Sequence, residues 1–278
     1  MIPCYVGAGY GAMIVTNGRR LRLGEALTAS VRGLVEAWRW AWGAIAACAL
    51  VWAVRPFVAG DFGWIWSAAA LIATLVLVGA LARTAISDDR DAARRLGLGP
   101  AGLQLGWPEL RLLGAALLCA VFLAMILSVV ALVLLAVFGI AGLNAEAIRL
   151  RDWGAVGPIW KLALLAVVTL SAFYALAVLA VRLSLFAPAT LGRGHMVSLN
   201  SMGIAQGSFW PLLGGLAVVG LPMLGLVILT GAGMVSGVVG WIVWVAMIFA
   251  VEAPLSLAFL GAAYRRLEYW TPQGATHD

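Results

Sequence analysis

Charged residues are scarce in this sequence, and their scarcity excludes a soluble protein. Asp, Glu, Lys and Arg together make up 11% of the 278 residues and hydrophobic residues 64%, whereas soluble domains carry about 25% charged residues. No soluble fold hides that much apolar surface from water. Membrane spans of about 20 residues each, with their loops, fill the whole length. No room is left for a separate globular domain of about 100 residues.

Cysteine and histidine are also few, which removes several kinds of chemistry. Cys4, Cys48 and Cys119 are too few and too scattered for a disulfide framework. His195 and His277 have no other ligand type at metal-binding spacing. We therefore expect no metal and no cofactor. The net charge of +6 gathers beside apolar segments, where anionic lipid headgroups attract it, so we expect membrane lipids and not nucleic acid as partners.

Apolar segments long enough to cross a membrane follow one another along the chain. Before the first of them, Leu23, Leu27, Val31, Leu34 and Trp38 recur at helical spacing, which is typical of an amphipathic helix lying along a membrane surface. The expected spans cover about residues 38–54, 64–82, 112–143, 158–181, 209–229 and 238–263.

These segments predict an all-α fold: a polytopic membrane helical bundle of about six transmembrane helices plus amphipathic interfacial helices. We expect residues 1–20 to form a flexible tail, 21–264 a single six-helix membrane domain and 265–278 a cytoplasmic tail. A second interfacial helix is expected within residues 183–208. Met13 is an alternative to Met1 as the true start.

The basic residues indicate how the spans are oriented. Fourteen of the 18 fall near span ends on one side, against Arg55, Arg149, Arg151 and Lys161 on the other. Because cytoplasmic loops carry an excess of Lys and Arg, both termini of this inner-membrane protein are expected in the cytoplasm. The arginines expected to anchor helices at the headgroups are Arg83, Arg182, Arg265 and Arg266.

The spans pair into three hairpins that open and close alike. An internal repeat and the shared chemistry of membrane boundaries both explain this likeness, and the sequence leaves the two explanations open. The similar openings are residues 38–43, 109–114 and 209–214, and the hairpins return to Arg83, Arg182 and Arg265.

Two stretches carry a resemblance to a known membrane domain. They are Val181-Arg182-Leu183-Ser184-Leu185-Phe186-Ala187-Pro188 and, after Ser201, Gly207-Ser208-Phe209-Trp210-Pro211-Leu212-Leu213-Gly214. This pattern resembles the integral membrane domain found with some bacterial glycerophosphoryl diester phosphodiesterases, and related stand-alone membrane proteins of unknown function. The resemblance implies a six-helix module that handles or senses lipid. It carries over no catalytic residue, because no phosphodiesterase barrel accompanies the module in these 278 residues.

Glu252 is the clearest candidate for a functional residue inside the membrane. It lies near the middle of the sixth expected span, where a carboxylate costs several kcal/mol unless it is protonated or paired. Pro254, two residues later, frees a backbone carbonyl one turn earlier and is expected to bend the helix beside the acid. Glu252 either binds a proton or a substrate headgroup, or it fixes helix packing through a hydrogen bond.

Small residues and a proline mark the last two spans. Gly233 and Gly237, four residues apart, predict a close approach of helices that serves bundle packing or oligomerisation. Pro222 lies inside the fifth span, where prolines occur routinely in membrane helices and also mark hinges.

Three functions are compatible with these features. The first is a non-enzymatic protein that interacts with lipid or serves as an accessory or assembly subunit of an envelope complex, with a membrane-protein partner or a second copy. The second is a small transporter or lipid translocator in which Glu252, Pro222 and Pro254 are the moving parts. The third, an intramembrane enzyme, needs convergent polar side chains at one depth, and no such set emerges from the sequence.

Overall fold

The computed structural model describes residues 23–58, 60–150, 156–194 and 208–267, and this part of the chain forms helices and their connections only. The helices are α1 (Leu23–Trp40), α2 (Trp42–Ala53), α3 (Gly63–Ile86), α4 (Arg90–Arg95), α5 (Trp107–Ala141), α6 (Ala145–Leu150), α7 (Ile159–Leu183), α8 (Phe186–Arg193), α10 (Phe209–Val219), α11 (Leu221–Gly231), α12 (Gly237–Ala246) and α13 (Ala253–Leu267). Short 3-10 turns lie at Arg55–Phe57, Gly60–Phe62 and Pro100–Gly102, and a π-helical segment, η4, at Met247–Glu252.

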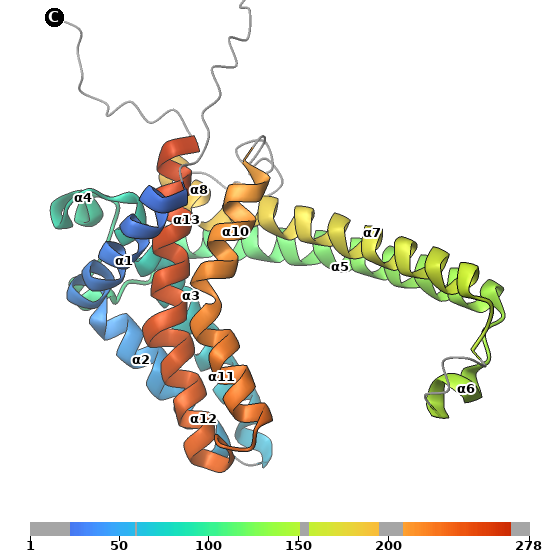
Figure 1. Cartoon of the computed structure of the whole chain (residues 1–278). Coiled ribbons are helices and arrows are strands. Elements are labelled where there is room, and N and C mark those ends of the chain that lie inside the picture. The colour runs from blue at the N-terminus through green and yellow to red at the C-terminus, as the bar shows by residue number, and fades with distance from the viewer. Residues whose placement is uncertain (1–22, 59, 151–155, 195–207, 268–278) are drawn as a thin grey trace, which may run out of the picture.

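The helices form two legs that diverge from a common end (Figure 1). One leg is a body that contains α2, α3 and the C-terminal helices α10 to α13, with α1 beside its upper part. The other leg is a long hairpin of α5 and α7. Helix α8 and the start of helix α10 lie where the legs meet (Figure 1).

The all-helical, multi-pass architecture is confirmed for the described residues. Four helical segments are long and apolar enough to cross a membrane: Gly63–Ile86, Pro100–Ala141, Ile159–Arg193 and Gly237–Leu267. Two further spans complete the expected six if each bent pair of helices counts as one span. One pair is α10 with α11, bent by 47°, and the other is α1 with the segment Trp42–Phe57, bent by 84°.

The bend at Ala41 separates a peripheral helix from a short span. The 84° turn sends α1 across the body while α2 runs along α3 (Figure 1). Small residues of α1 face the body: Ala26, Ser30 and Ala37 are buried, and a Cβ built on Gly33 would lie 2.6 Å from the Cβ of Ala258. Of the larger apolar side chains that marked α1 as amphipathic, Val31 and Trp38 are exposed, whereas Leu23 and Leu27 pack against buried side chains of the body.

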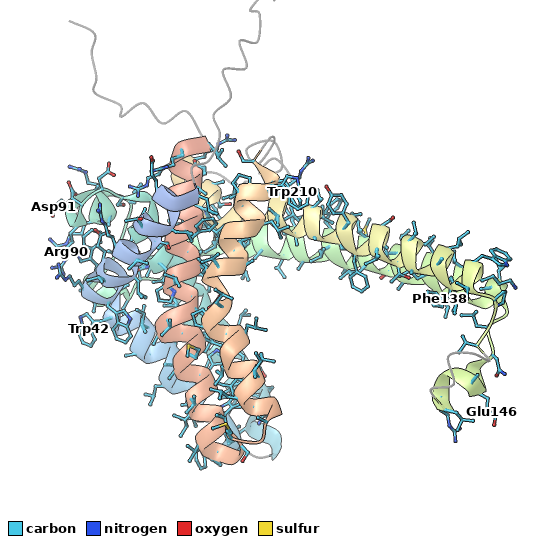
Figure 2. The ribbon with its side chains drawn as sticks, in the orientation of Figure 1. Trp42, Arg90, Asp91, Phe138, Glu146 and Trp210 are labelled. Carbon is cyan, nitrogen blue, oxygen red and sulfur yellow. The ribbon has the colours of Figure 1, made fainter. Side chains whose placement is uncertain are left out.

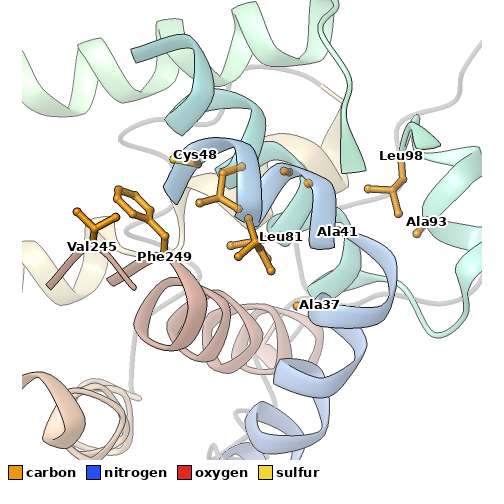
Figure 3. Close-up of a cluster of buried hydrophobic side chains, with 12 residues drawn as sticks. Ala37, Ala41, Cys48, Leu81, Ala93, Leu98, Val245 and Phe249 are labelled. Carbon is orange, nitrogen blue, oxygen red and sulfur yellow. The ribbon is translucent and has the colours of Figure 1, made fainter. Parts of the chain in front are cut away.

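The body is held together by two clusters of buried apolar side chains. The cluster in Figure 3 joins α1, α2, α3 and the last span, with Ala41, Cys48, Leu81 and Phe249 at its centre. The second cluster lies nearer the common end, around Phe259. Both clusters are rich in alanine, because small side chains let membrane helices approach closely.

The α5–α7 hairpin packs mainly on itself. Only four residues of α5 are buried, and the last of them along the chain is Cys119. At 1.5 Å per residue, the 35 residues of α5 extend about 52 Å, more than the roughly 30 Å of a bilayer core. The tip is closed by a hydrogen bond of 3.0 Å from Lys161 Nζ to the carbonyl of Ala141. Figure 2 shows apolar side chains along the hairpin, including Phe138 near its tip.

The glycines that permit close packing are not those expected. Gly233 and Gly237 both have positive φ, 76° and 65°, and a Cβ on either would meet nothing within 4 Å. They form the turn between α11 and α12, so the predicted close approach there is wrong. The close approach occurs at Gly261, where a Cβ would collide with the Cβ and the backbone of Ala85, because α13 lies directly against α3.

The ends of the domain differ slightly from the prediction. α13 continues to Leu267, past the expected boundary at residue 264. The predicted N-terminal tail and the polar part of the segment around His195 lie outside the described residues, as do residues 268–278.

Candidate functional site

A polar groove lies at the common end of the molecule, between α1, the end of α3 and the end of α13. Its volume is about 630 Å³, within the range of 300–1,000 Å³ that is usual for small-molecule sites. Its lining is unusual for so apolar a chain, since it carries three arginines and three acids: Arg32, Arg265, Arg266, Glu25, Glu36 and Asp88.

Two ion pairs among the lining residues tie three elements together. Arg265 Nη1 lies 2.7 Å from Asp88 Oδ1, which joins α13 to the loop after α3. Arg266 Nη1 lies 2.7 Å from Glu25 Oε2, which joins α13 to α1. The neighbouring arginines therefore reach in different directions, each to an acid on a different element.

A cation and an anion on α1 complete the lining. Arg32 and Glu36 are four residues apart and so lie on one face of the helix, one turn from each other, and both line the groove. Neither makes an ion pair within the described part of the chain. The groove thus offers one positive and one negative side chain to a ligand, while its other four charges already neutralise each other in pairs.

The hydroxyl groups that line the groove are engaged with the backbone. Thr28 Oγ1 donates to the carbonyl of Gly24 at 2.9 Å, and Ser87 Oγ donates to the carbonyl of Arg83 at 2.7 Å. Both hydroxyls therefore donate to backbone carbonyls within their own helices or at the helix end.

The structure separates the four arginines that the sequence assigned to headgroup anchoring. Arg265 and Arg266 lie at the rim of the groove and are partly exposed, as a headgroup anchor requires. Arg182, at the end of α7, is half-buried, and its Nε has no hydrogen-bond partner among the described residues. Arg83 differs from the expectation, because its side chain is only 1% exposed and cannot extend to lipid headgroups.

Arg83 forms a buried ion pair that the sequence did not reveal. Its Nη1 lies 2.6 Å from Oε1 of Glu109, which is 2% exposed. The contact is an ion pair and not a well-aligned hydrogen bond, since neither atom has a hydrogen-bond partner. Arg83 Nε donates to the carbonyl of Leu96 at 2.9 Å. A Cβ on Gly79 would lie 3.1 Å from both charged atoms, so the glycine leaves the space that the pair occupies.

Glu109 and Arg83 connect the first hairpin to the second. Glu109 stands in the first turn of α5, where a negative charge is favoured by the helix dipole. The signal in the sequence was an acid one turn inside an apolar span, preceded by an arginine at the end of the span before it. That pattern does not by itself say that the two side chains meet.

Glu252 lies at the end of the π-helical segment, one residue before α13 begins. Its Oε1 accepts a hydrogen bond from Ser256 Oγ at 3.3 Å, and its Oε2 is buried without a hydrogen-bond partner among the described residues. Neither the polar groove nor the apolar cavity between α5 and α7 includes Glu252 in its lining. The two candidate sites, groove and carboxyl, are therefore separate.

Pro254 releases a backbone carbonyl, as the sequence predicted. Proline has no N–H, so Ala250, four residues earlier, lacks that partner. Trp38 Nε1 of α1 donates to the carbonyl of Ala250 at 2.8 Å. The irregularity appears as a π-helical segment within one span, Gly237–Leu267.

Comparison with known proteins finds no matching family model, no matching curated protein and no matching solved structure. The resemblance to the membrane domain of some glycerophosphoryl diester phosphodiesterases therefore stays a prediction.

Proposed function

We propose that this chain is a non-enzymatic integral membrane protein that binds a zwitterionic phospholipid headgroup in the groove between α1, α3 and α13. The observation that carries the proposal is the groove's free charge pair, Arg32 and Glu36, in a cavity of about 630 Å³. A phosphate-ammonium headgroup such as that of phosphatidylethanolamine carries the complementary two charges close together.

The position of α1 supports lipid as the source of the ligand. Val31 and Trp38 are 59% and 44% exposed, although the indole N–H of Trp38 also reaches the body at the carbonyl of Ala250. The small residues Ala26, Ser30 and Ala37 of α1 are buried against the body. A helix with outward apolar side chains and a charged face lies in the interface between headgroups and acyl chains, and Trp favours that depth. The groove beside α1 is then at the level of the headgroups.

The chemistry of the ligand follows from the two side chains. The guanidinium of Arg32 suits a phosphate oxygen pair, and the carboxylate of Glu36 accepts hydrogen bonds from an ammonium group. A purely anionic headgroup would gain the first contact and meet the carboxylate of Glu36 with repulsion. The groove therefore favours a zwitterion over an anionic lipid.

The proposal includes the orientation of the protein and the membrane in which it lies. The arginine-rich end of the molecule faces the cytoplasm if the excess of basic residues governs insertion, and the resemblance would put the protein in a bacterial inner membrane. The exposed α5–α7 hairpin gives such a protein apolar surface for a membrane partner or a second copy, which suits an accessory or assembly subunit.

A second candidate function is a small transporter or lipid translocator that uses Glu252. The observation in its favour is that Glu252 lies between two irregular helices, the π-helical segment and the α10–α11 bend of 47°. Discontinuous helices of this kind form substrate and ion sites in transporters.

Native mass spectrometry tests the headgroup proposal. The protein is reconstituted in mixed vesicles of phosphatidylethanolamine and phosphatidylglycerol, extracted gently, and examined for retained lipid and for partner chains. We expect one phosphatidylethanolamine per chain in the wild type, and at least a tenfold loss of retention in the double variant Arg32→Gln, Glu36→Gln.

The matched control is Arg94→Gln, which removes an exposed arginine outside the groove and should leave retention unchanged. Equal retention in the double variant and in the wild type would contradict the proposal, as would preferential retention of phosphatidylglycerol. A stoichiometric protein partner, in contrast, would support the accessory role.

A further inference from the structure

Glu252 lies beside breaks in two helices. The first is in its own helix, where the π-helical segment Met247–Glu252 is followed at once by Pro254. The second is next to it, where α10 ends at Val219 and α11 starts at Leu221, with Gly220 between them and a bend of 47°. Pro222 is near the start of α11 and has no N–H to continue the helix.

The two breaks meet at the carboxyl group. A Cβ built on Gly220 would lie 3.9 Å from Glu252 Oε1, so the backbone of the α10–α11 break is adjacent to the carboxyl. Because Gly220 has no side chain, nothing on it separates that backbone from the acid. Helix breaks inside a membrane occur where the backbone is buried in protein or borders a polar site, and here both breaks adjoin one acid.

Among the described residues, no cation forms an ion pair with Glu252. The elements packed against the π-helical segment are α2, α11, α12 and α13 and, through the hydrogen bond from Trp38 to Ala250, α1. Helices α2, α10, α11 and α12 contain no Asp, Glu, Lys, Arg or His. The charged residues of α1 are Glu25, Arg32, Glu36 and Arg39, and none of them forms an ion pair with Glu252 in the described part of the chain. The other titratable side chains on the packed elements are Cys48 on α2 and Tyr264, Arg265 and Arg266 on α13. The two arginines are about 20 Å along the helix from Glu252 and pair with other acids.

A metal ion does not fit this donor set. The described residues hold no group of three or more His, Cys, Asp or Glu that is placed to bind a metal. The side-chain oxygens at the site are those of Glu252 and the hydroxyl of Ser256, and Ca²⁺ or Mg²⁺ needs about six oxygen ligands. A single proton on Oε2 removes the charge without any further ligand.

We propose that Glu252 is an exchangeable proton-binding site in the membrane interior, set between the breaks at Gly220 and at the π-helical segment. Ser256 Oγ donates to Oε1, and Oε2 carries the proton. The site takes up and releases one proton and holds no metal. This proposal does not rest on the headgroup groove, which shares no residue with it.

Labelling with dicyclohexylcarbodiimide tests this site, because the reagent partitions into lipid and needs a protonated carboxyl. The acid gives its proton to a carbodiimide nitrogen, its oxygen attacks the central carbon, and the adduct rearranges to a stable N-acylurea without a further reactant. Glu252 is half-buried and so within reach of a reagent dissolved in the bilayer. Vesicles that contain the full chain are treated at several pH values, and peptides are examined by mass spectrometry.

We expect labelling of Glu252 at least tenfold above that of Glu109, whose carboxylate is paired with Arg83. Labelling should fall as the pH rises and should be absent from Glu252→Gln. Arg32→Gln, which alters the groove alone, should be labelled like the wild type, so failure of the headgroup proposal leaves this result intact. Absence of labelling at Glu252 from pH 5 to pH 9 would overturn the proposal. Less labelling in Na⁺ or K⁺ than in choline at equal ionic strength would also overturn it, because it would indicate a cation site.

Discussion

Breaking the Arg83–Glu109 pair should lower the free energy of unfolding more than a substitution at an exposed position. Both side chains are almost fully enclosed, with 1% and 2% exposed, so Glu109→Gln leaves a guanidinium charge buried without its partner. Removal of one partner from a buried pair costs about 3–5 kcal/mol. The loss should be large because Arg83 also holds the loop after α3 through its hydrogen bond to Leu96.

A double replacement distinguishes the cost of the unpaired charge from the cost of lost packing. Arg83→Met with Glu109→Leu removes both charges and keeps apolar volume, and such replacements are often neutral or stabilising. Only the bond to the Leu96 carbonyl is then lost, at about 1–3 kcal/mol. The double variant should therefore be more stable than Glu109→Gln alone.

The assay is reversible unfolding in mixed micelles, with sodium dodecyl sulfate as the denaturant and tryptophan fluorescence as the signal. Asp91→Asn is the control, because the Asp91–Arg94 pair is 3.7 Å apart and largely exposed and is expected to contribute about 0–1 kcal/mol. A loss below about 1 kcal/mol in Glu109→Gln, or a double variant as unstable as the single one, would refute the reasoning.

Two further substitutions test how the last span is packed. Gly261→Leu should destabilise the fold by about 1–3 kcal/mol or more, because its side chain would collide with Ala85 of α3. The control is Gly139→Leu on α5, where an added Cβ would meet nothing within 4 Å. It should leave the midpoint of unfolding unchanged in the same assay. Trp38→Phe should cost about 1–3 kcal/mol, because the carbonyl of Ala250 loses its donor, and the loss should appear as faster hydrogen exchange in the π-helical segment.

The all-helical, multi-pass character could be predicted from the sequence because it depends on local composition. Runs of about 20 apolar residues become spans wherever they occur, and the arginines at the ends of these runs mark one end of the molecule. The third expected span, residues 112–143, corresponds to the single 35-residue helix α5. The release of a carbonyl before Pro254 was predictable for the same reason, since it follows from the covalent structure of proline.

Contacts between distant elements could not be predicted in this way. Glu109 and Arg83 are 26 positions apart along the chain, and only the packing of α5 on α3 brings them together. The groove has the same origin, since its ion pairs join Asp88 and Glu25 to arginines near residue 265. Each acid looks like an ordinary solvated charge when the sequence is read alone.

Small residues were the least predictable feature, because a glycine either fills a tight helix contact or supports a turn. Gly233 and Gly237 fit the spacing of a helix contact, and their positive φ values make them turn residues. Gly261, in contrast, is the point at which α13 touches α3. The difference depends on which face of the helix another helix covers, and no local pattern records that.

The central claim is that the body spans the membrane with the groove at one surface, and labelling of single cysteines tests it most directly. In a background without Cys4, Cys48 and Cys119, Thr28→Cys marks the groove and Ser236→Cys marks the opposite end, just before Gly237. The span from Gly237 to Leu267 covers 31 residues, or about 46 Å of helix. An impermeant maleimide added outside sealed cells should label Ser236→Cys, and should label Thr28→Cys only after the membrane is opened. Labelling of both positions from the same side would contradict the account.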